Sequence, residues 1–215
     1  MTIWRLGLFF ALCAVIVPFK FSHAEYSPRD FFTSAPSELF YTDDEMSEED
    51  KAAVLKKGFK KVEQFNCSAW GVAAESKDTL TLKYCADSEV IVRVYPVKDA
   101  PKQPLVAVQS VRASGRAVDL AWFKVSGGPD SFAPLTEEQL KKFGLERPPA
   151  IDFMAKGNPL PEGGPPTINM ELDDEGRVSS SIYTWMEPQW ANQEPDFSFK
   201  FVWEGSRFTR QAIKN

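Results

Sequence analysis

The residues of this chain with the most defined chemistry are two cysteines, Cys67 and Cys85. The apolar side chains of 67–74 and 79–85 alternate, which predicts the two strands of a hairpin centred on Ser76. This register places the two cysteines opposite each other, so we expect a structural disulfide between them. A redox-active pair is the alternative, but it lacks both the C-x-x-C spacing and a neighbouring group that would lower a thiol pKa.

The same hairpin register sorts the other side chains of these strands into faces. Trp70 is expected opposite Leu82, and Val72 opposite Leu80. Because side chains alternate along a strand, these four residues share one face, which we expect to join the core.

A row of aromatic residues near the C-terminus has the chemistry to bind a ligand. Every second residue of one segment is aromatic, and three further rings precede it: Phe197, Phe199, Phe201 and Trp203, after Tyr183, Trp185 and Trp190. Flat rings stack on sugars or line apolar cavities. The strict period of two instead favours a strand that faces the core. Trp190, in an irregular segment, is the first candidate for an exposed partner contact, with Trp185 and Tyr183 next to it.

Catalytic residue sets are few. The only histidine, His23, falls in a predicted leader, so neither a Ser-His-Asp set nor a histidine zinc site is expected in the mature protein. Phosphate-binding glycine loops and zinc-type cysteine spacings are also missing, and we expect no cofactor and no metal. A carboxylate pair drawn from Asp173, Asp174 and Glu175 is the enzymatic alternative, although acidic residues are common in turns.

Residues 1–24 have the pattern of a secretory signal peptide. Arg5 precedes the apolar run 6–17, which is shorter than the about 20 residues that a membrane-spanning helix needs. Ala24 ends a small-residue cleavage site, so we expect the mature protein to begin at Glu25. The sequence therefore predicts export to the periplasm or the exterior, with no membrane span after the leader is removed.

Two alternatives to cleavage are open. An uncleaved anchor needs a longer apolar run, but Lys20 interrupts this one. Lipid attachment at Cys13 needs small residues before the cysteine, whereas Phe10 and Leu12 precede it.

The net charge of the chain limits the classes of partner that we expect. The formal net charge is −5, and loss of the leader removes two basic residues and no acidic one. An acidic chain is not expected to bind nucleic acid or an anionic membrane through its overall charge. A protein partner, if basic, would complement it.

Strands dominate the expected fold. Nine segments have the apolar alternation or the bounded apolar runs of strands: 67–74, 79–85, 89–96, 105–113, 116–125, 167–173, 177–185, 197–203 and 207–213. Short turns join most of them, and Gly115, Gly176 and Gly205 suit three of these turns. The strand–helix alternation of a parallel sheet is missing.

Two helices are expected. Ser47 is a good N-cap for a helix over 48–57, which has acidic residues in its first turn and Gly58 placed for a left-handed C-terminal position. A short helix in the long central connection is bounded by Thr136 and Gly144.

These patterns together predict one α+β domain over 25–215. It is a predominantly antiparallel β meander of about nine strands, as an open sheet or a partly closed barrel, with one N-terminal helix and a short helix in the central connection. The aromatic residues of 25–42 are expected to dock on it. The function that fits is an exported, non-enzymatic binding or interaction protein of the inhibitor, immunity or envelope-accessory type. A carrier of an apolar or glycan ligand and a carboxylate-only hydrolase are the alternatives.

Overall fold

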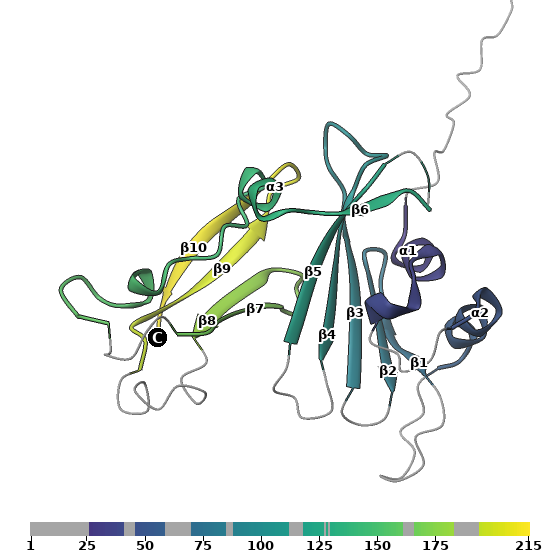
Figure 1. Cartoon of the computed structure of the whole chain (residues 1–215), viewed down its shortest axis with the longest axis horizontal. Coiled ribbons are helices and arrows are strands. Elements are labelled where there is room, and N and C mark those ends of the chain that lie inside the picture. The colour runs from purple at the N-terminus through teal and green to yellow at the C-terminus, as the bar shows by residue number, and fades with distance from the viewer. Residues whose placement is uncertain are drawn as a thin grey trace, which may run out of the picture.

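The computed structural model describes residues 26–40, 46–58, 70–84, 88–111, 118–126, 128, 130–160, 166–182 and 194–215. Over these residues the chain is an α+β fold of ten strands in two open antiparallel sheets, with a few short helices (Figure 1). The predicted fold class is confirmed. The predicted leader lies outside the described residues, so its cleavage and the export that it implies stay predictions.

The six-stranded sheet follows chain order. Its strands are β1 (Gly71–Glu75), β2 (Thr79–Tyr84), β3 (Ser88–Tyr95), β4 (Leu105–Val111), β5 (Val118–Val125) and β6 (Phe132–Pro134). The four-stranded sheet has the order β10-β9-β8-β7, with β7 (Ile168–Leu172), β8 (Val178–Ile182), β9 (Phe197–Trp203) and β10 (Phe208–Lys214). The helices are α1 (Pro28–Ser34), α2 (Glu48–Lys56) and α3 (Glu137–Lys142), with 3-10 turns η1 (Ser37–Phe40) and η2 (Ala150–Phe153). No helix among the described residues is long and apolar enough to cross a membrane.

The elements form three layers (Figure 1). The six-stranded sheet lies in the middle, with α1, η1 and α2 on one face and the four-stranded sheet on the other. The six-stranded sheet has a hydrophobic core on each face, and strand β4 contributes side chains to both. Val106 and Val108 belong to the core on the helix side, whereas Leu105 and Ala107 belong to the core between the sheets. Because side chains alternate along a strand, an uninterrupted apolar run covers both faces.

Hydrogen bonds from side chains to backbone carbonyls join the two sheets. The Tyr95 hydroxyl donates to the Gly176 carbonyl at 2.9 Å, and the Trp203 Nε1 donates to the Pro96 carbonyl at 3.1 Å. Burial raises the pKa of Tyr95, so its hydroxyl keeps the proton that it donates. Both bonds orient the second sheet on the first.

The aromatic row of β9 belongs to the core between the sheets. Phe199 and Phe201 are 5% and 1% exposed, and Phe199 packs edge-on against Phe153 with ring centroids 4.9 Å apart. The rings of Trp203 and Phe208 are also 4.9 Å apart. The row therefore packs against the protein's own side chains, as its period of two predicts.

Three hairpins turn where the sequence predicts. Leu105 pairs with Lys124, which centres the β4–β5 hairpin on 114–115 as predicted, although the turn itself lies outside the described residues. The two later hairpins turn at Gly176 and Gly205, whose φ angles are +72° and +88°. Glycine adopts these angles without the steric cost that a Cβ atom would impose.

The register of the first hairpin differs from the prediction. Val72 pairs with Leu82, not Leu80. The turn runs later than expected, because the Ser76 N–H donates to the Thr79 carbonyl at 2.8 Å. A bulge in β1 after Val72 then shifts the pairing again, and alternation alone does not reveal a bulge.

The faces of this hairpin are nevertheless as predicted. Leu80 and Leu82 are buried in the core on the helix side, and Trp70 packs against that core. Cys67 and Cys85 lie outside the described residues. Their disulfide stays a prediction, but the register that placed them opposite each other does not hold in the paired residues.

Helix α2 begins as expected and ends differently. Ser47 and Asp50 form a capping box, in which each side chain accepts the backbone N–H of the other. Gly58 does not take a left-handed conformation. It forms a bridge with Val72, whose N–H donates to the Lys57 carbonyl at 2.8 Å. The predicted glycine cap is therefore wrong, because the strand satisfies the backbone at this end of the helix.

Helix α1 is a helix that the apolar pattern does not predict. Ser27 and Asp30 form a capping box, and Pro28 occupies the first helical position. Phe31 and Phe32 are fully buried, which confirms that this segment docks on the domain.

Helix α3 is confirmed in the central connection. The Thr136 hydroxyl accepts from the Gln139 N–H, and Gly144 follows the helix at a φ of +78°. The start of β10 lies against this glycine, because a Cβ atom placed on Gly144 would be 2.2 Å from the Phe208 carbonyl oxygen.

Lys51 joins α2 to the end of α1. Its Nζ donates to the Thr33 carbonyl at 3.3 Å and to the Ala35 carbonyl, and lies 6.0 Å from the centroid of the Phe40 ring. The residue is 5% exposed, and burial lowers the pKa of its ammonium. The contact places a cation beside the carbonyl end of a helix, which favours positive charge.

We expect Lys51→Ala to lower the free energy of unfolding by about 2–3 kcal/mol, because two carbonyls lose their donor and the aliphatic stem no longer packs. Lys56→Ala, on the exposed side of the same helix, is the matched control and should change it by less than about 0.5 kcal/mol. Urea unfolding followed by circular dichroism measures both. Equal losses would show that the Lys51 contacts contribute nothing.

Candidate functional site

The side chains proposed from the sequence for partner contact and for the disulfide lie outside the described residues. They are Tyr183, Trp185, Trp190, Cys67 and Cys85. The described part of the chain holds no group of three or more histidine, cysteine or acidic residues placed to bind a metal ion.

The acidic turn between β7 and β8 has a structural role. Asp173 accepts hydrogen bonds from the Glu175 and Arg177 N–H groups at 3.0 and 2.9 Å, and from Arg177 Nε at 2.7 Å. Burial raises the pKa of Asp173, but the hydrogen bonds and the charge of Arg177 outweigh burial and hold this pKa below its usual value. The carboxylate is therefore committed to the turn.

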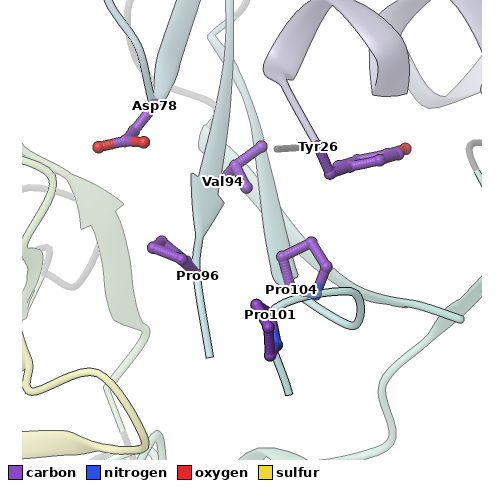
Figure 2. A pocket seen from close by; sticks show the side chains of 6 residues that line it. All are labelled: Tyr26, Asp78, Val94, Pro96, Pro101 and Pro104. Atoms are coloured by element: carbon purple, nitrogen blue, oxygen red, sulfur yellow. The ribbon is translucent and has the colours of Figure 1, made fainter. Parts of the chain in front are cut away.

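A shallow hollow lies at the C-terminal end of β3 (Figure 2). Its lining is mainly apolar and rigid: Tyr26, Asp78, Val94, Pro96, Pro101 and Pro104. In Figure 2 the Tyr26 side chain extends away from Pro96 and Pro101. Burial raises the pKa of Tyr26 to about 12. The accessible volume of the hollow is about 10 Å³, far less than the roughly 300–1,000 Å³ of typical small-molecule sites.

Sheet edges are the other places where this fold can bind a partner, because an edge strand presents unpaired N–H and C=O groups. Three of the four edges are covered or short. At β1, the Val72 N–H donates to Lys57. Strand β6 has three residues and ends at Pro134. Strand β7 packs against β5, and its Leu172 N–H donates to the Gln109 side chain.

Strand β10 is the fourth edge, with seven residues paired to β9 without a bulge. The Glu204 N–H donates to the Arg207 carbonyl, and the Asn215 N–H donates to the Asp196 carbonyl. Hydrogen-bonded and non-hydrogen-bonded pairs alternate along antiparallel strands. The odd-numbered residues of β10 therefore bond to β9, and the even-numbered ones point their N–H and C=O groups away from the sheet.

Within the part of the chain that the structure describes, most outward backbone groups of β10 have no partner. The Phe208 N–H is covered, because it donates to the Phe143 carbonyl at 2.7 Å. Arg210, Ala212 and Lys214 are exposed, and among the described residues no group bonds to their outward backbone. We call these three residues the β10 edge. The outward N–H and C=O groups of these three alternate residues can form hydrogen bonds with another chain.

The surroundings of the β10 edge combine charge with an exposed apolar side chain. Arg210 lies over the Phe199 ring, 4.9 Å from its centroid, and its Nη1 is 2.9 Å from the Asp152 carboxylate. Ile151, the neighbour of Asp152 in η2, is 51% exposed. A chain that pairs with β10 would therefore pass close to both a guanidinium and an apolar surface.

The sequence predicts the strand at 207–213 but not its place at an edge. Thr209, Arg210 and Gln211 make this strand polar on both faces, whereas an inner strand of an open sheet needs at least one apolar face. That loss of alternation is the signal for an edge.

Comparison with known proteins supports the fold alone. No protein-family description and no curated protein matches the chain. The structure is similar to a domain of an uncharacterized protein from Porphyromonas gingivalis W83, with a TM-score of 0.55 and 15% sequence identity over 85% of this chain and 96% of that one. At this identity the similarity concerns the arrangement of the elements.

Proposed function

We propose that this chain is an exported interaction protein that binds an extended segment of a partner protein by strand addition to the β10 edge. The observation that carries the proposal is that no described residue bonds to the outward backbone of Arg210, Ala212 and Lys214 on a regular strand, while the other sheet edges are covered or short. Export to the periplasm or the exterior is part of the proposal and rests on the predicted leader.

Strand addition suits this geometry for a physical reason. The partner's backbone gains hydrogen bonds from the edge, and its alternate side chains contact the two faces of the sheet. The edge is already held straight by β9, so this protein loses little conformational freedom on binding. The ordering cost falls mainly on the partner segment.

A test uses Ala212→Pro. Proline removes the outward N–H of residue 212, but not a bond to β9, and an edge strand tolerates proline at such a position. A phage-displayed library of random nine-residue peptides is selected on the native protein. We expect the enriched peptides to bind the native protein and Ala212→Ser, which keeps the N–H, and to lose at least about ten-fold in affinity for Ala212→Pro.

A second substitution checks which N–H groups of β10 face β9 and which point outward. Gln211→Pro removes an N–H that faces β9, so it should destabilise the domain by about 3 kcal/mol, whereas Ala212→Pro should cost less than about 1 kcal/mol. Selected peptides that bind Ala212→Pro as tightly as the native protein would overturn the proposal.

A further inference from the structure

The β10 edge is basic, although the whole chain is acidic. Strand β10 contains Arg210 and Lys214 and no acidic residue, and Arg207 precedes it. On the neighbouring strand, Lys200 is the register partner of Gln211. Within the described residues, Arg207, Lys200 and Lys214 have no ion pair, and only Arg210 has a carboxylate, that of Asp152.

An added strand would bring its side chains close to Arg210 and Lys214, which lie on the edge strand itself. Residues directly opposite each other on adjacent strands have Cβ atoms about 4.5–5.5 Å apart, and opposite charges there stabilise the pair. One face of the added strand would meet Arg210, Ala212 and Lys214. The small side chain of Ala212 leaves room between the two cations for a carboxylate that reaches either of them.

A second copy of this chain is a poorer occupant of the edge. Two β10 strands paired antiparallel about Gln211 would place Arg210 of one copy opposite Ala212 of the other, and diagonal to that copy's Arg210 and Lys214. Like charges at such positions repel. Basic side chains on an edge strand also discourage pairing between identical copies.

We infer that the segment bound at the β10 edge is acidic, with carboxylates on the face that meets Arg210 and Lys214. This inference rests on the proposed strand addition. It names the chemistry of the partner, an extended acidic stretch of polypeptide. Ile151, exposed beside Asp152, adds an apolar contact for a side chain that passes Arg210.

The test compares two fluorescein-labelled nonapeptides, one alternating glutamate and threonine and the other alternating lysine and threonine. Both have the same strand propensity at threonine and differ in the sign of charge on one face. Fluorescence anisotropy at low and high salt should give about ten-fold tighter binding of the glutamate peptide, with the preference reduced by salt. Lys214→Glu should reduce the preference several-fold, and Ala212→Pro should abolish binding.

The possible failures are distinguishable. Equal binding of both peptides, a preference for lysine, or no binding of either would overturn the acidic partner. If the library peptides still lose affinity for Ala212→Pro, the proposed strand addition remains supported although the partner is not acidic. Sedimentation of the native protein as a dimer that Ala212→Pro converts to a monomer would also overturn the acidic partner, because the edge would then hold a second copy.

Discussion

Phe31→Ala should lower the free energy of unfolding by about 3–5 kcal/mol, the loss typical of a buried phenylalanine. The Phe31 side chain is fully buried, and its ring centroid lies 5.4 Å from that of Phe123, 5.1 Å from Phe132 and 6.5 Å from Phe40. These neighbours come from β5, β6 and η1, so one ring joins the helix layer to the sheet. Its removal leaves a cavity that rigid strands cannot fill.

Urea unfolding at constant m-value measures this loss. Phe31→Leu is the matched control, because leucine fills most of the volume and should lose about 1–1.5 kcal/mol. A loss below about 1 kcal/mol for the alanine variant would contradict the packing of α1 on the sheet, because surface substitutions produce changes of that size or smaller.

Local signals in the sequence predicted the turn positions of the three later hairpins. Gly176 and Gly205 lie in the turns that join two pairs of antiparallel strands. The position of a turn determines which residues pair across its hairpin. The β4–β5 register agrees in the same way with the turn that the sequence predicts at 114–115. Each of these predictions depends on neighbours in sequence, and the structure adds no long-range contact that overrides them.

Long-range contacts explain the differences. Gly58 is a suitable helix cap, but β1 lies next to it and pairs with it instead. The first register differs because its turn comes later than predicted and because a bulge follows Val72, and side-chain alternation reveals neither. The capping box of Ser27 and Asp30 is readable in the sequence, but two consecutive phenylalanines follow it and do not give a helical apolar period.

The position of β10 at an edge is a property of strand order, and its local signal in the sequence is limited to the polar character of both faces at Thr209, Arg210 and Gln211. The sequence identifies the last strand and its pairing with β9 across Gly205, but not which side of the pair meets β8. Structure settles that β9 is the inner strand. The aromatic row explains why: Phe199 and Phe201 are buried by the first sheet and η2, whereas Arg210 and Gln211 are exposed.

Gly144→Ala should lower the free energy of unfolding by about 2–5 kcal/mol, because a left-handed backbone and a steric overlap act together. Gly144 has a φ of +78°, and a Cβ atom on it would lie 2.2 Å from the Phe208 carbonyl oxygen. That oxygen belongs to the backbone at the start of β10, so it cannot turn aside as a flexible side chain could. Phe208 is also buried, and its N–H donates to the Phe143 carbonyl at 2.7 Å.

Gly157→Ala separates the two causes of this loss. Gly157 also has a positive φ, +97°, but nothing lies within 4 Å of a Cβ atom placed there. The free energy of unfolding of this control should therefore fall only by the cost of placing alanine in a left-handed backbone conformation, about 1–2 kcal/mol. Hydrogen exchange adds a local readout, since Gly144→Ala should speed exchange of the Phe208 amide by displacing its acceptor, and Gly157→Ala should not. Equal losses of stability and unchanged exchange in both variants would mean that the start of β10 shifts freely, and that α3 does not hold this end of the β10 strand in place.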